Sequence, residues 1–283
     1  MLRGVFLEKP RGYCPAETVG RTRLGSIHEE HKLPNQDAWM GFDDPKFSFA
    51  GVFDGHGEGG ERISELAAMV VSDRLKVLLG SDPQADLEKT LREAILAGSN
   101  AVDSLSVSVS AGCTASVVIV RGSECVVGTI GDSTVLVMTV KGHFTSALKP
   151  KYKTKNHRVD LPSERDRILS FGGKIFEAYV LDKEDQTKGL MITRTMGDTD
   201  MRRNGVSSEP EIKKLELKVA DRFILLATDG LWDSDILLTF QGTCDIVSHT
   251  FKAGNLEVVL DELMQRTAEI ATDDDCTIVC MRL

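Results

Sequence analysis

The sequence of 283 residues predicts an α+β fold in which antiparallel β-sheets pack together and α-helices cover them on the outside. Short apolar runs typical of strands follow one another with only a few residues between them. Such short connections favour antiparallel neighbours, because a parallel pair needs a longer crossover. The helical runs carry a single apolar stripe, which is the pattern of a helix packed on one side against a sheet.

The strands are predicted from runs of apolar and β-branched residues. We expect them at residues 46–53, 112–120, 124–130, 134–140, 222–228 and 276–282. Arg121-Gly122-Ser123 follows one of these runs and Lys141-Gly142 follows another, and both are typical of hairpin turns. These signals predict hairpins without fixing the order of the strands.

The helices are predicted at residues 62–79 and 256–270, where apolar side chains recur at helical spacing. Asp82-Pro83 is typical of an N-cap followed by proline at the first helical position, so a further helix is expected to begin there. A short helix opening at Ser163 is expected to end at Gly172-Gly173. No linker or repeat divides the chain, so we expect one domain at 21–283, preceded by an extension at 1–20 that packs on it or leads into it.

The composition excludes several classes of protein. A net charge of −9 and a pI near 5.3 argue against nucleic-acid binding, which normally needs a basic face. No apolar run approaches the ~20 residues of a membrane span, and the first residues lack the apolar core of a secretory signal, so we expect a cytoplasmic protein, with the nucleus also possible. The six cysteines show no framework spacing; Cys113, Cys125, Cys276 and Cys280 lie in strand-like runs and are expected to be core residues rather than zinc ligands.

Aspartates follow or precede several of the predicted strands. Asp54 ends the first run and is followed by Gly55-His56-Gly57, and Asp229-Gly230 ends a later run in the same way. The others are Asp37, Asp132 and the run Asp273 to Asp275. A single aspartate after a strand is usually a turn residue. Five such sites in one domain point further, because carboxylates gathered at converging strand ends repel one another unless cations neutralise them.

Oxygen ligands from carboxylates favour Mg²⁺ or Mn²⁺ over zinc. A glycine after Asp54 would let the backbone carbonyl approach a metal closely. Two such ions can activate a water molecule and bind a phosphoryl oxygen, which predicts hydrolysis of a phosphoester. The sequence contains no P-loop, EF-hand, G-x-S-x-G or H-E-x-x-H motif that would support another chemistry.

An ordered set of motifs gives the chain a closer resemblance. In order they are Asn35-Gln-Asp37, Phe53-Asp-Gly-His-Gly57, Gly112-Cys-Thr-Ala115, Gly131-Asp-Ser133, Thr193-Arg-Thr-Met-Gly-Asp198, Pro210-Glu-Ile212, Ala227-Thr-Asp-Gly-Leu-Trp-Asp233 and Asp274-Asp-Cys-Thr277. From about residue 20 to the C-terminus the sequence resembles the metal-dependent protein phosphatases, the type 2C serine/threonine phosphatases. This resemblance implies two stacked antiparallel β-sheets flanked by α-helices and makes residues 21–283 the catalytic domain.

The resemblance also implies a metal centre of two ions, with a possible weaker third. Asp54 would bridge the two ions, the Gly55 carbonyl would bind one of them, and Asp37 would hold the water around them. Asp229 and Asp274 would ligate the other ion, although the run Asp273 to Asp275 leaves the register open. Asp132 and Asp233 would form the weaker third site together with Asp229.

Two further residues receive catalytic roles from the resemblance and from their chemistry. His56 is the candidate general acid for the departing seryl or threonyl oxygen, since an imidazolium can give a proton near neutral pH; alternatively, it merely pairs with a carboxylate. Lys32 stands where the family usually has the arginine that grips the substrate phosphate, and it would keep the charge without the bidentate fork; alternatively, it is a solvated surface lysine.

Some positions depart from the family pattern. Gln36 replaces a common glutamate, Asn156-His157-Arg158-Val159 replaces Asp-His-Lys-Pro, and Thr134 replaces an arginine. We expect the last two changes to lie outside the metal set. Arg194 and Asp198 are expected to form a buried structural pair, and residues 165–188 correspond to the family's flap beside the active site, where they could read the peptide around the phosphate.

The sequence therefore predicts a monomeric, Mg²⁺- or Mn²⁺-dependent protein phosphatase that acts on phosphoserine and phosphothreonine in proteins, with no nucleic-acid or membrane partner. One alternative is an inactive phosphatase-like module that binds a signalling partner, which would show no strong pair of Mn²⁺ sites. Another is a calcium-binding structural protein, which Ca²⁺ would stabilise without any hydrolysis.

Overall fold

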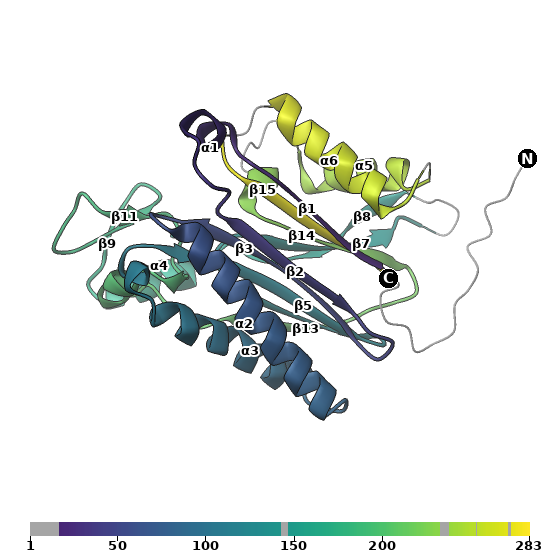
Figure 1. Cartoon of the computed structure of the whole chain (residues 1–283), viewed down its shortest axis with the longest axis horizontal. Coiled ribbons are helices and arrows are strands. Elements are labelled where there is room, and N and C mark those ends of the chain that lie inside the picture. Colours follow the sequence, from purple (N-terminus) through teal and green to yellow (C-terminus); the bar gives the residue numbers. More distant parts are fainter. Residues whose placement is uncertain (1–16, 143–146, 233–237, 253, 271–272) are drawn as a thin grey trace, which may run out of the picture.

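A computed structural model describes residues 17–142, 147–232, 238–252, 254–270 and 273–283. Two antiparallel sheets lie face to face, with one pair of helices outside each of them (Figure 1). Helices α2 (Gly60–Ser81) and α3 (Leu87–Asp103) cover one sheet, and α5 (Phe240–Thr250) and α6 (Leu256–Ile270) cover the other. This four-layer arrangement confirms the predicted α+β sandwich.

Each sheet combines segments that are distant in the sequence. The seven-stranded sheet has the order β12-β4-β3-β5-β6-β13, with β2 paired to β3. Its strands are β2 (Asp37–Asp43), β3 (Ser48–His56), β4 (Gly112–Cys113), β5 (Ala115–Arg121), β6 (Glu124–Ile130), β12 (Met196–Gly197) and β13 (Glu211–Glu216). The five-stranded sheet has the order β1-β15-β14-β7-β8. Its strands are β1 (Glu17–Arg23), β7 (Thr134–Val140), β8 (Leu148–Lys153), β14 (Asp221–Ala227) and β15 (Cys276–Arg282).

The alternation of side chains along each strand builds the layers. In β3, Phe49 and Phe53 belong to the core beneath α2 and α3, whereas Ala50 and Val52 belong to the core between the sheets. In β15, Ile278 faces the α5 and α6 side and Val279 faces the other sheet. Strands buried on both faces need apolar residues at nearly every position, which is why these runs were visible in the sequence.

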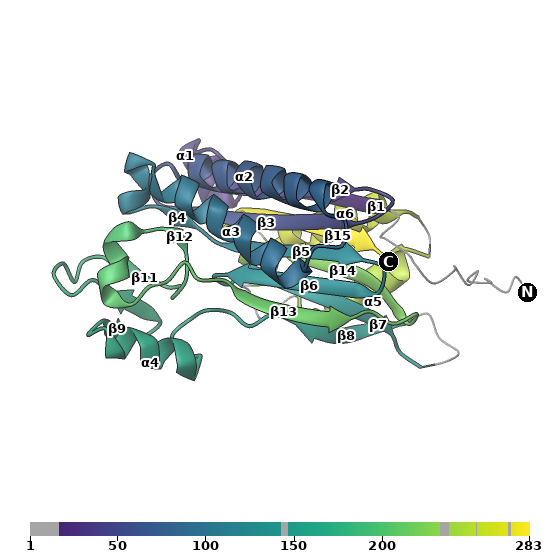
Figure 2. The same cartoon turned by 90° about the horizontal axis from the view of Figure 1, so that it is seen from below.

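A smaller assembly lies at one end of the sandwich, beyond the strand ends (Figures 1 and 2). It contains α4 (Pro162–Ser170) and a three-stranded sheet of β9 (Lys174–Phe176), β10 (Tyr179–Leu181) and β11 (Gly189–Leu190). This is the segment that the resemblance matched to the family's flap. Helix α1 (Ser26–His31) lies at the same end (Figure 1), and the short 3₁₀ helices are η1 (Ser106–Val109), η2 (Thr199–Asn204) and η3 (Asp229–Leu231).

One predicted helix start is wrong. Asp82 ends α2 instead of beginning α3, and its carboxylate accepts a hydrogen bond from the backbone of Gln84 in the turn between the two helices. The N-cap of α3 is Asp86, whose Oδ1 accepts from the backbone N–H groups of Glu88 and Lys89 at 2.9 and 3.1 Å. Aspartate serves both turns and N-caps, so an Asp-Pro pair cannot by itself distinguish them.

The edges of the predicted domain also become visible. Glu17 pairs with Arg282 across β1 and β15, so residues 17–20 of the expected extension belong to the five-stranded sheet, and residues 1–16 lie outside the described part of the chain.

The described cysteines are all buried and free. Cys276 and Cys280 both contribute to the core beneath α5 and α6, as alternation on one strand requires.

The expected pair between Arg194 and Asp198 is wrong, because the two residues have other partners. Arg194 binds Glu164, whose side chain is only 1% exposed, with Nη2 at 2.7 Å from Oε1. Arg167 and Thr193 donate to the same carboxylate, each at 2.7 Å. Burial alone would raise the pKa of Glu164, but these three donors lower it to about 2. Glu164 therefore fastens α4 to the segment that leads into β12.

We expect Glu164→Gln to lower the free energy of unfolding at pH 7 by about 3–5 kcal/mol, because it leaves two guanidinium groups without their carboxylate. The pKa of Glu164 is lower in the folded state, so its stabilisation is complete above the unfolded value and is lost as the pH falls toward about 2. Urea unfolding at pH 7, 5 and 3.5 should show the two proteins converging at acid pH. Glu93→Gln, which alters an exposed partner of Arg74, is the control; an equal gap at every pH would contradict this assignment.

Candidate metal centre

Two of the predicted site aspartates face each other across neighbouring strands. Asp37 begins β2, Asp54 lies near the end of β3, and the two residues are directly opposite in the antiparallel register. Like charges in this position normally destabilise a sheet. The charge repulsion between Asp37 and Asp54 therefore destabilises the folded chain, which an aspartate in an ordinary turn would not do.

The second sheet brings two further aspartates to the same place. Asp229 follows β14 and opens η3, and Asp274 lies two residues before the start of β15, the strand paired with β14. Asp132 lies in the short connection by which the chain passes from β6 in one sheet to β7 in the other. The ends of both sheets thus supply carboxylates to one region.

The electrostatics show how closely these groups are gathered. Burial raises the pKa of Asp54 well above its ordinary value, and the charges of Asp37, Asp229, Asp274 and Asp132 raise it further. Burial likewise raises the pKa of Asp37 to about 7, although a hydrogen bond from Thr228 Oγ1 at 2.8 Å opposes the shift. Among the described residues, no side chain donates a hydrogen bond to the Asp54 carboxylate. The structure therefore brings together five of the predicted site aspartates.

The backbone around Asp54 is fixed from two sides. Its N–H donates to Thr114 Oγ1 at 3.0 Å, and its carbonyl accepts from the Thr114 N–H at 2.9 Å. The next residue, Gly55, has no room for a side chain: a Cβ there would lie 2.5 Å from the backbone oxygens of both Gln36 and Gly60. The close approach of these two backbone segments explains why residue 55 is a glycine. Binding of a metal ion by its carbonyl stays a prediction.

The run Asp273 to Asp275 divides into separate roles. The Asp275 carboxylate is buried and accepts hydrogen bonds from the backbone of Gly25 and Gln36, at 2.8 and 2.7 Å, and lies 2.9 Å from His28 Nδ1. It therefore anchors α1 to the start of β15. Asp274 is the member of the run whose charge acts on both Asp54 and Asp37. This arrangement favours Asp274 over Asp275 as the metal ligand.

His56 has a carboxylate partner that the sequence analysis assigned elsewhere. Its Nε2 lies 2.7 Å from Asp198 Oδ2, and its side chain is 29% exposed while that of Asp198 is buried. Burial lowers the pKa of His56, but the charge and hydrogen bond of Asp198, together with the charge of Asp132, raise it above its ordinary value overall. Asp198 is held in the left-handed region at φ 44°, immediately after the short strand β12. Asp198 thereby orients the imidazole and favours its charged form.

Lys32 lies at the C-terminal end of α1. It is exposed, with φ 56°, and its backbone N–H caps the helix by donating to Glu29 O. Because Asp275 and Asp273 both contact the α1 segment, the helix that carries Lys32 is fastened to the strand end that carries Asp274. The described residues include no ion-pair partner for Lys32, which leaves its ammonium group available to solvent.

Arg158 is a residue of the candidate site that the sequence analysis missed. Its Nε donates to Asp132 Oδ2 at 2.6 Å and its Nη2 donates to Asp229 Oδ2 at 2.8 Å. The expectation that the departures at 156–159 lie outside the metal set is therefore wrong for this residue. The sequence offered one signal for this residue, the arginine in place of the family's lysine, because only arginine can donate to two carboxylates from one rigid group.

Asp233, the remaining predicted ligand, lies outside the described residues.

The chemistry of these side chains fits Mg²⁺ or Mn²⁺, since every donor is a carboxylate oxygen. In the described part of the chain, however, no three His, Cys, Asp or Glu side chains are arranged so as to hold an ion without moving. Several carboxylate oxygens bond to protein donors instead, from Thr228 to Asp37, from the Asp275 backbone to Asp274, and from Arg158 to Asp132 and Asp229. An ion held by these residues would require their side chains to rotate away from those donors.

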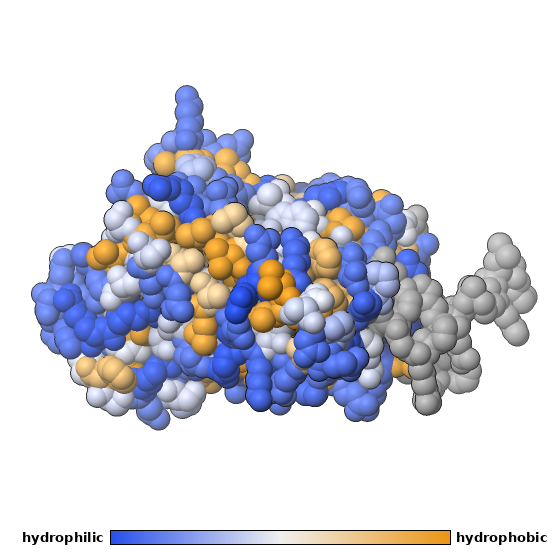
Figure 3. Space-filling view, turned by 60° about the horizontal axis from the view of Figure 1, so that its bottom comes forward, coloured by the Kyte–Doolittle hydropathy of each residue, from blue (hydrophilic) through white to orange (hydrophobic). Residues whose placement is uncertain are grey.

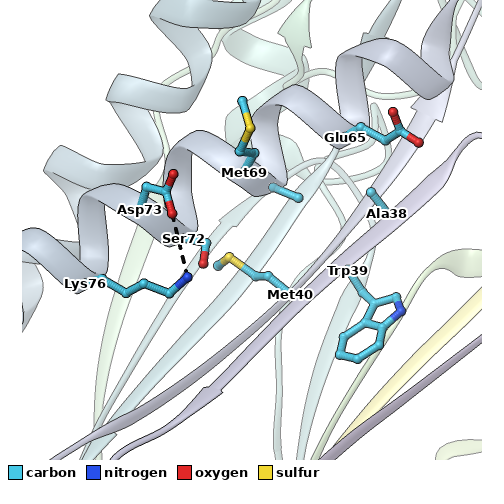
Figure 4. Close-up of a pocket in the computed structure, with 9 residues that line it drawn as sticks. Ala38, Trp39, Met40, Glu65, Met69, Ser72, Asp73 and Lys76 are labelled. Carbon is cyan, nitrogen blue, oxygen red and sulfur yellow. Dashed lines mark ion pairs between the residues drawn. The ribbon is translucent and has the colours of Figure 1, made fainter.

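A separate shallow groove lies between β2 and α2 (Figure 4). It has a volume of about 340 Å³ and is lined by residues such as Met40, Glu65 and Met69, with the ion pair of Lys76 and Asp73 at one end. None of the predicted site residues lines it.

In the space-filling view, apolar residues reach the surface in patches among hydrophilic ones (Figure 3). None of the described helices is both long enough and apolar enough to cross a membrane.

Comparisons with known proteins agree with the fold and the motifs. The family model described as protein phosphatase 2C matches residues 16–276. Probable protein phosphatase 2C 12 of Oryza sativa subsp. japonica is 29% identical, over 98% of this chain and 85% of the relative. Probable protein phosphatase 2C 64 of the same organism is 32% identical, over 93% of this chain and 66% of the relative. The crystal structure of a serine-threonine phosphatase 2C from Toxoplasma gondii shares the fold, with a TM-score of 0.78 and 18% identity over 98% of this chain and 96% of that one. The chain therefore belongs to the protein phosphatase 2C family, whose members are phosphoprotein phosphatases.

Proposed function

We propose that this protein removes phosphate from phosphoserine and phosphothreonine side chains and that it depends on two Mg²⁺ or Mn²⁺ ions. The observation that carries the proposal is the gathering of four aspartates around a fifth, Asp54, whose carboxylate has no donor among the described side chains. The negative charges of these carboxylates repel one another, and bound divalent cations would neutralise them. Membership of the protein phosphatase 2C family supports the same reading.

Four aspartates and one carbonyl would hold the two ions. Asp54 lies at the centre of the cluster and would bridge them, while Asp37, Asp229, Asp274 and the Gly55 carbonyl would bind from the surrounding strand ends. When bound, the ions would activate water as the nucleophile and offset the charge of the phosphate. Thr228 would fix the orientation of Asp37, and Thr114 would fix the backbone of Asp54.

His56 would give a proton to the departing seryl or threonyl oxygen. The leaving alkoxide needs that proton, because it is a strong base. Asp198 orients the imidazole and favours its charged form, so it is a positioning residue. Lys32 would contact the substrate phosphate from α1, and the segment of α4 and β9 to β11 would contact the surrounding peptide.

We expect Asp198→Asn to lower kcat about 10- to 100-fold on a phosphoserine peptide, because an orienting partner of this kind is typically worth that much. The same variant combined with His56→Gln should be no slower than His56→Gln alone, since both act through one imidazole. Steady-state kinetics of the two single variants and the double variant measure this. Independent, multiplicative losses would show that Asp198 supports the fold rather than His56.

The proposed function is tested by phosphate release from purified, chelator-treated protein. Phosphoserine and phosphothreonine peptides should be hydrolysed after Mn²⁺ or Mg²⁺ is added, and a phosphotyrosine peptide of the same sequence should be a much poorer substrate. Activity that survives chelation would refute metal dependence. Mn²⁺ binding without hydrolysis of any phosphopeptide would favour the inactive, partner-binding alternative, and stabilisation by Ca²⁺ alone would favour the structural one.

We further propose that the protein is monomeric and cytoplasmic. Its acidic charge and its mixed apolar and hydrophilic surface are compatible with a monomer. Light scattering of the purified chain tests the first statement, and localisation of the tagged full-length chain tests the second.

A further inference from the structure

Arg158 joins two of the clustered aspartates with one side chain. Its Nε and Nη2 each donate to a different carboxylate, at 2.6 Å to Asp132 and 2.8 Å to Asp229. The side chains involved are 22%, 4% and 17% exposed for Arg158, Asp132 and Asp229, so the contacts are shielded from solvent. A guanidinium held in this way is a fixed cation within the acidic cluster.

The backbone around Arg158 keeps the guanidinium in this position. The preceding residue, His157, exchanges two hydrogen bonds with Gly131, through its backbone N–H at 3.0 Å and its Nδ1 at 3.2 Å. Gly131 directly precedes Asp132, so the arginine and its first carboxylate are fastened side by side. Arg158 also forms a β-bridge with Ile192, and the next residue, Val159, is buried in the core beneath α4.

This position is the one at which the resemblance predicts a weaker third ion. That site would use Asp132, Asp229 and Asp233, of which Asp233 lies outside the described residues. An oxygen of each of the other two carboxylates already accepts a hydrogen bond from Arg158. An ion at these oxygens would have to displace the guanidinium or lie beside its positive charge. Both are unfavourable in a partly buried site, where charge interactions are stronger than in water. The two described carboxylates of this site, as Arg158 holds them, therefore do not fit a third ion.

We propose that the Arg158 guanidinium replaces the third divalent cation in this chain, so that the centre holds two ions and no more. The proposal rests on the proposed function, because it presupposes the two-ion centre around Asp54. It makes Arg158 a structural cation: it neutralises Asp132 and Asp229 at any metal concentration, and the chain loses a site whose occupancy would vary with that concentration.

Counting bound Mn²⁺ tests the proposal directly. Equilibrium dialysis with electron paramagnetic resonance detection of free Mn²⁺ should give two ions for the wild type and three for Arg158→Gln, in which the guanidinium no longer lies against the two carboxylates. Three ions in the wild type, or two in the variant, would overturn the role of Arg158 and leave the two-ion phosphatase intact. No bound Mn²⁺ in the wild type would overturn the proposed function and this inference together.

Thermal stability gives a second readout that does not depend on activity. In chelator, Arg158→Gln should have a lower Tm than the wild type, because Asp132 and Asp229 lose the positive charge of the guanidinium. Saturating Mn²⁺ should close most of that gap, since the third ion then takes the place of the guanidinium. Arg203→Gln is the matched control: it removes an arginine from the buried Asp182, 2.7 Å away, and Mn²⁺ should leave its deficit unchanged. A variant that stays unfolded in both conditions, or a gap that Mn²⁺ does not reduce, would contradict the proposal.

Discussion

Asp54→Asn should abolish phosphate release and, at the same time, make the metal-free protein more stable. Asp54 lies opposite Asp37 and within reach of the charges of Asp229, Asp274 and Asp132, and its pKa is raised well above the ordinary value. A neutral amide of nearly the same shape removes that repulsion. It would also remove the proposed ligand shared by the two ions, and a contribution of several kcal/mol corresponds to a loss of activity of about 10³-fold or more.

The opposite signs of the two effects make this prediction specific. An aspartate that merely serves a turn would lower stability when replaced by asparagine. The measurements are phosphopeptide hydrolysis in Mn²⁺ and Tm in chelator, where each kcal/mol gained is worth about 2–4 °C in domains of 150–250 residues. Asp182→Asn provides the contrast, because the pKa of Asp182 is lowered despite burial by its bond from Arg203, so that its loss should lower the Tm. A fall in Tm for Asp54→Asn would contradict the metal centre.

His56→Gln should lower kcat on a phosphoserine peptide by about 10²- to 10⁴-fold, the range expected for loss of a general acid. The loss should be much smaller on p-nitrophenyl phosphate. The nitrophenolate is a weak base and leaves without a proton, whereas a seryl alkoxide does not. The ratio of the two losses therefore isolates proton donation from any general damage to the centre.

The control for this comparison is His249→Gln, which changes an exposed histidine on α5. It should leave both substrates unaffected. Equal losses on the two substrates for His56→Gln would assign His56 a structural role as the partner of Asp198. A change in Mn²⁺ affinity of the same size as the change in kcat would lead to the same conclusion.

The layers of the fold could be predicted because burial on both faces leaves a strong pattern. Strands β3, β14 and β15 are buried along nearly their whole length and each contains a run of apolar residues, so they are recognised without knowledge of their neighbours. The edge strands β8 and β13, with the sequences LKPKYK and EIKKLE, have half-exposed faces and were missed. Their pairing is determined by the partner strand rather than by their own sequence.

The aspartate cluster could be predicted because strand ends converge, but its partners could not. Arg158 and Asp229 are 71 residues apart, and His56 and Asp198 are 142 residues apart. Such contacts depend on how two sheets and a surface segment are placed, which no local pattern contains. For the same reason, only the structure shows that Asp275 holds α1 by hydrogen bonds, which leaves Asp274 as the favoured metal ligand.

The central claim is that divalent cations bind among these carboxylates, and anomalous diffraction tests it most directly. Crystals of the wild-type chain grown with Mn²⁺ should show two anomalous peaks that share the Asp54 carboxylate as a ligand, with Arg158 still bonded to Asp132. An Asp54 carboxylate without Mn²⁺ beside it, in crystals of a protein that hydrolyses phosphopeptides, would contradict the account.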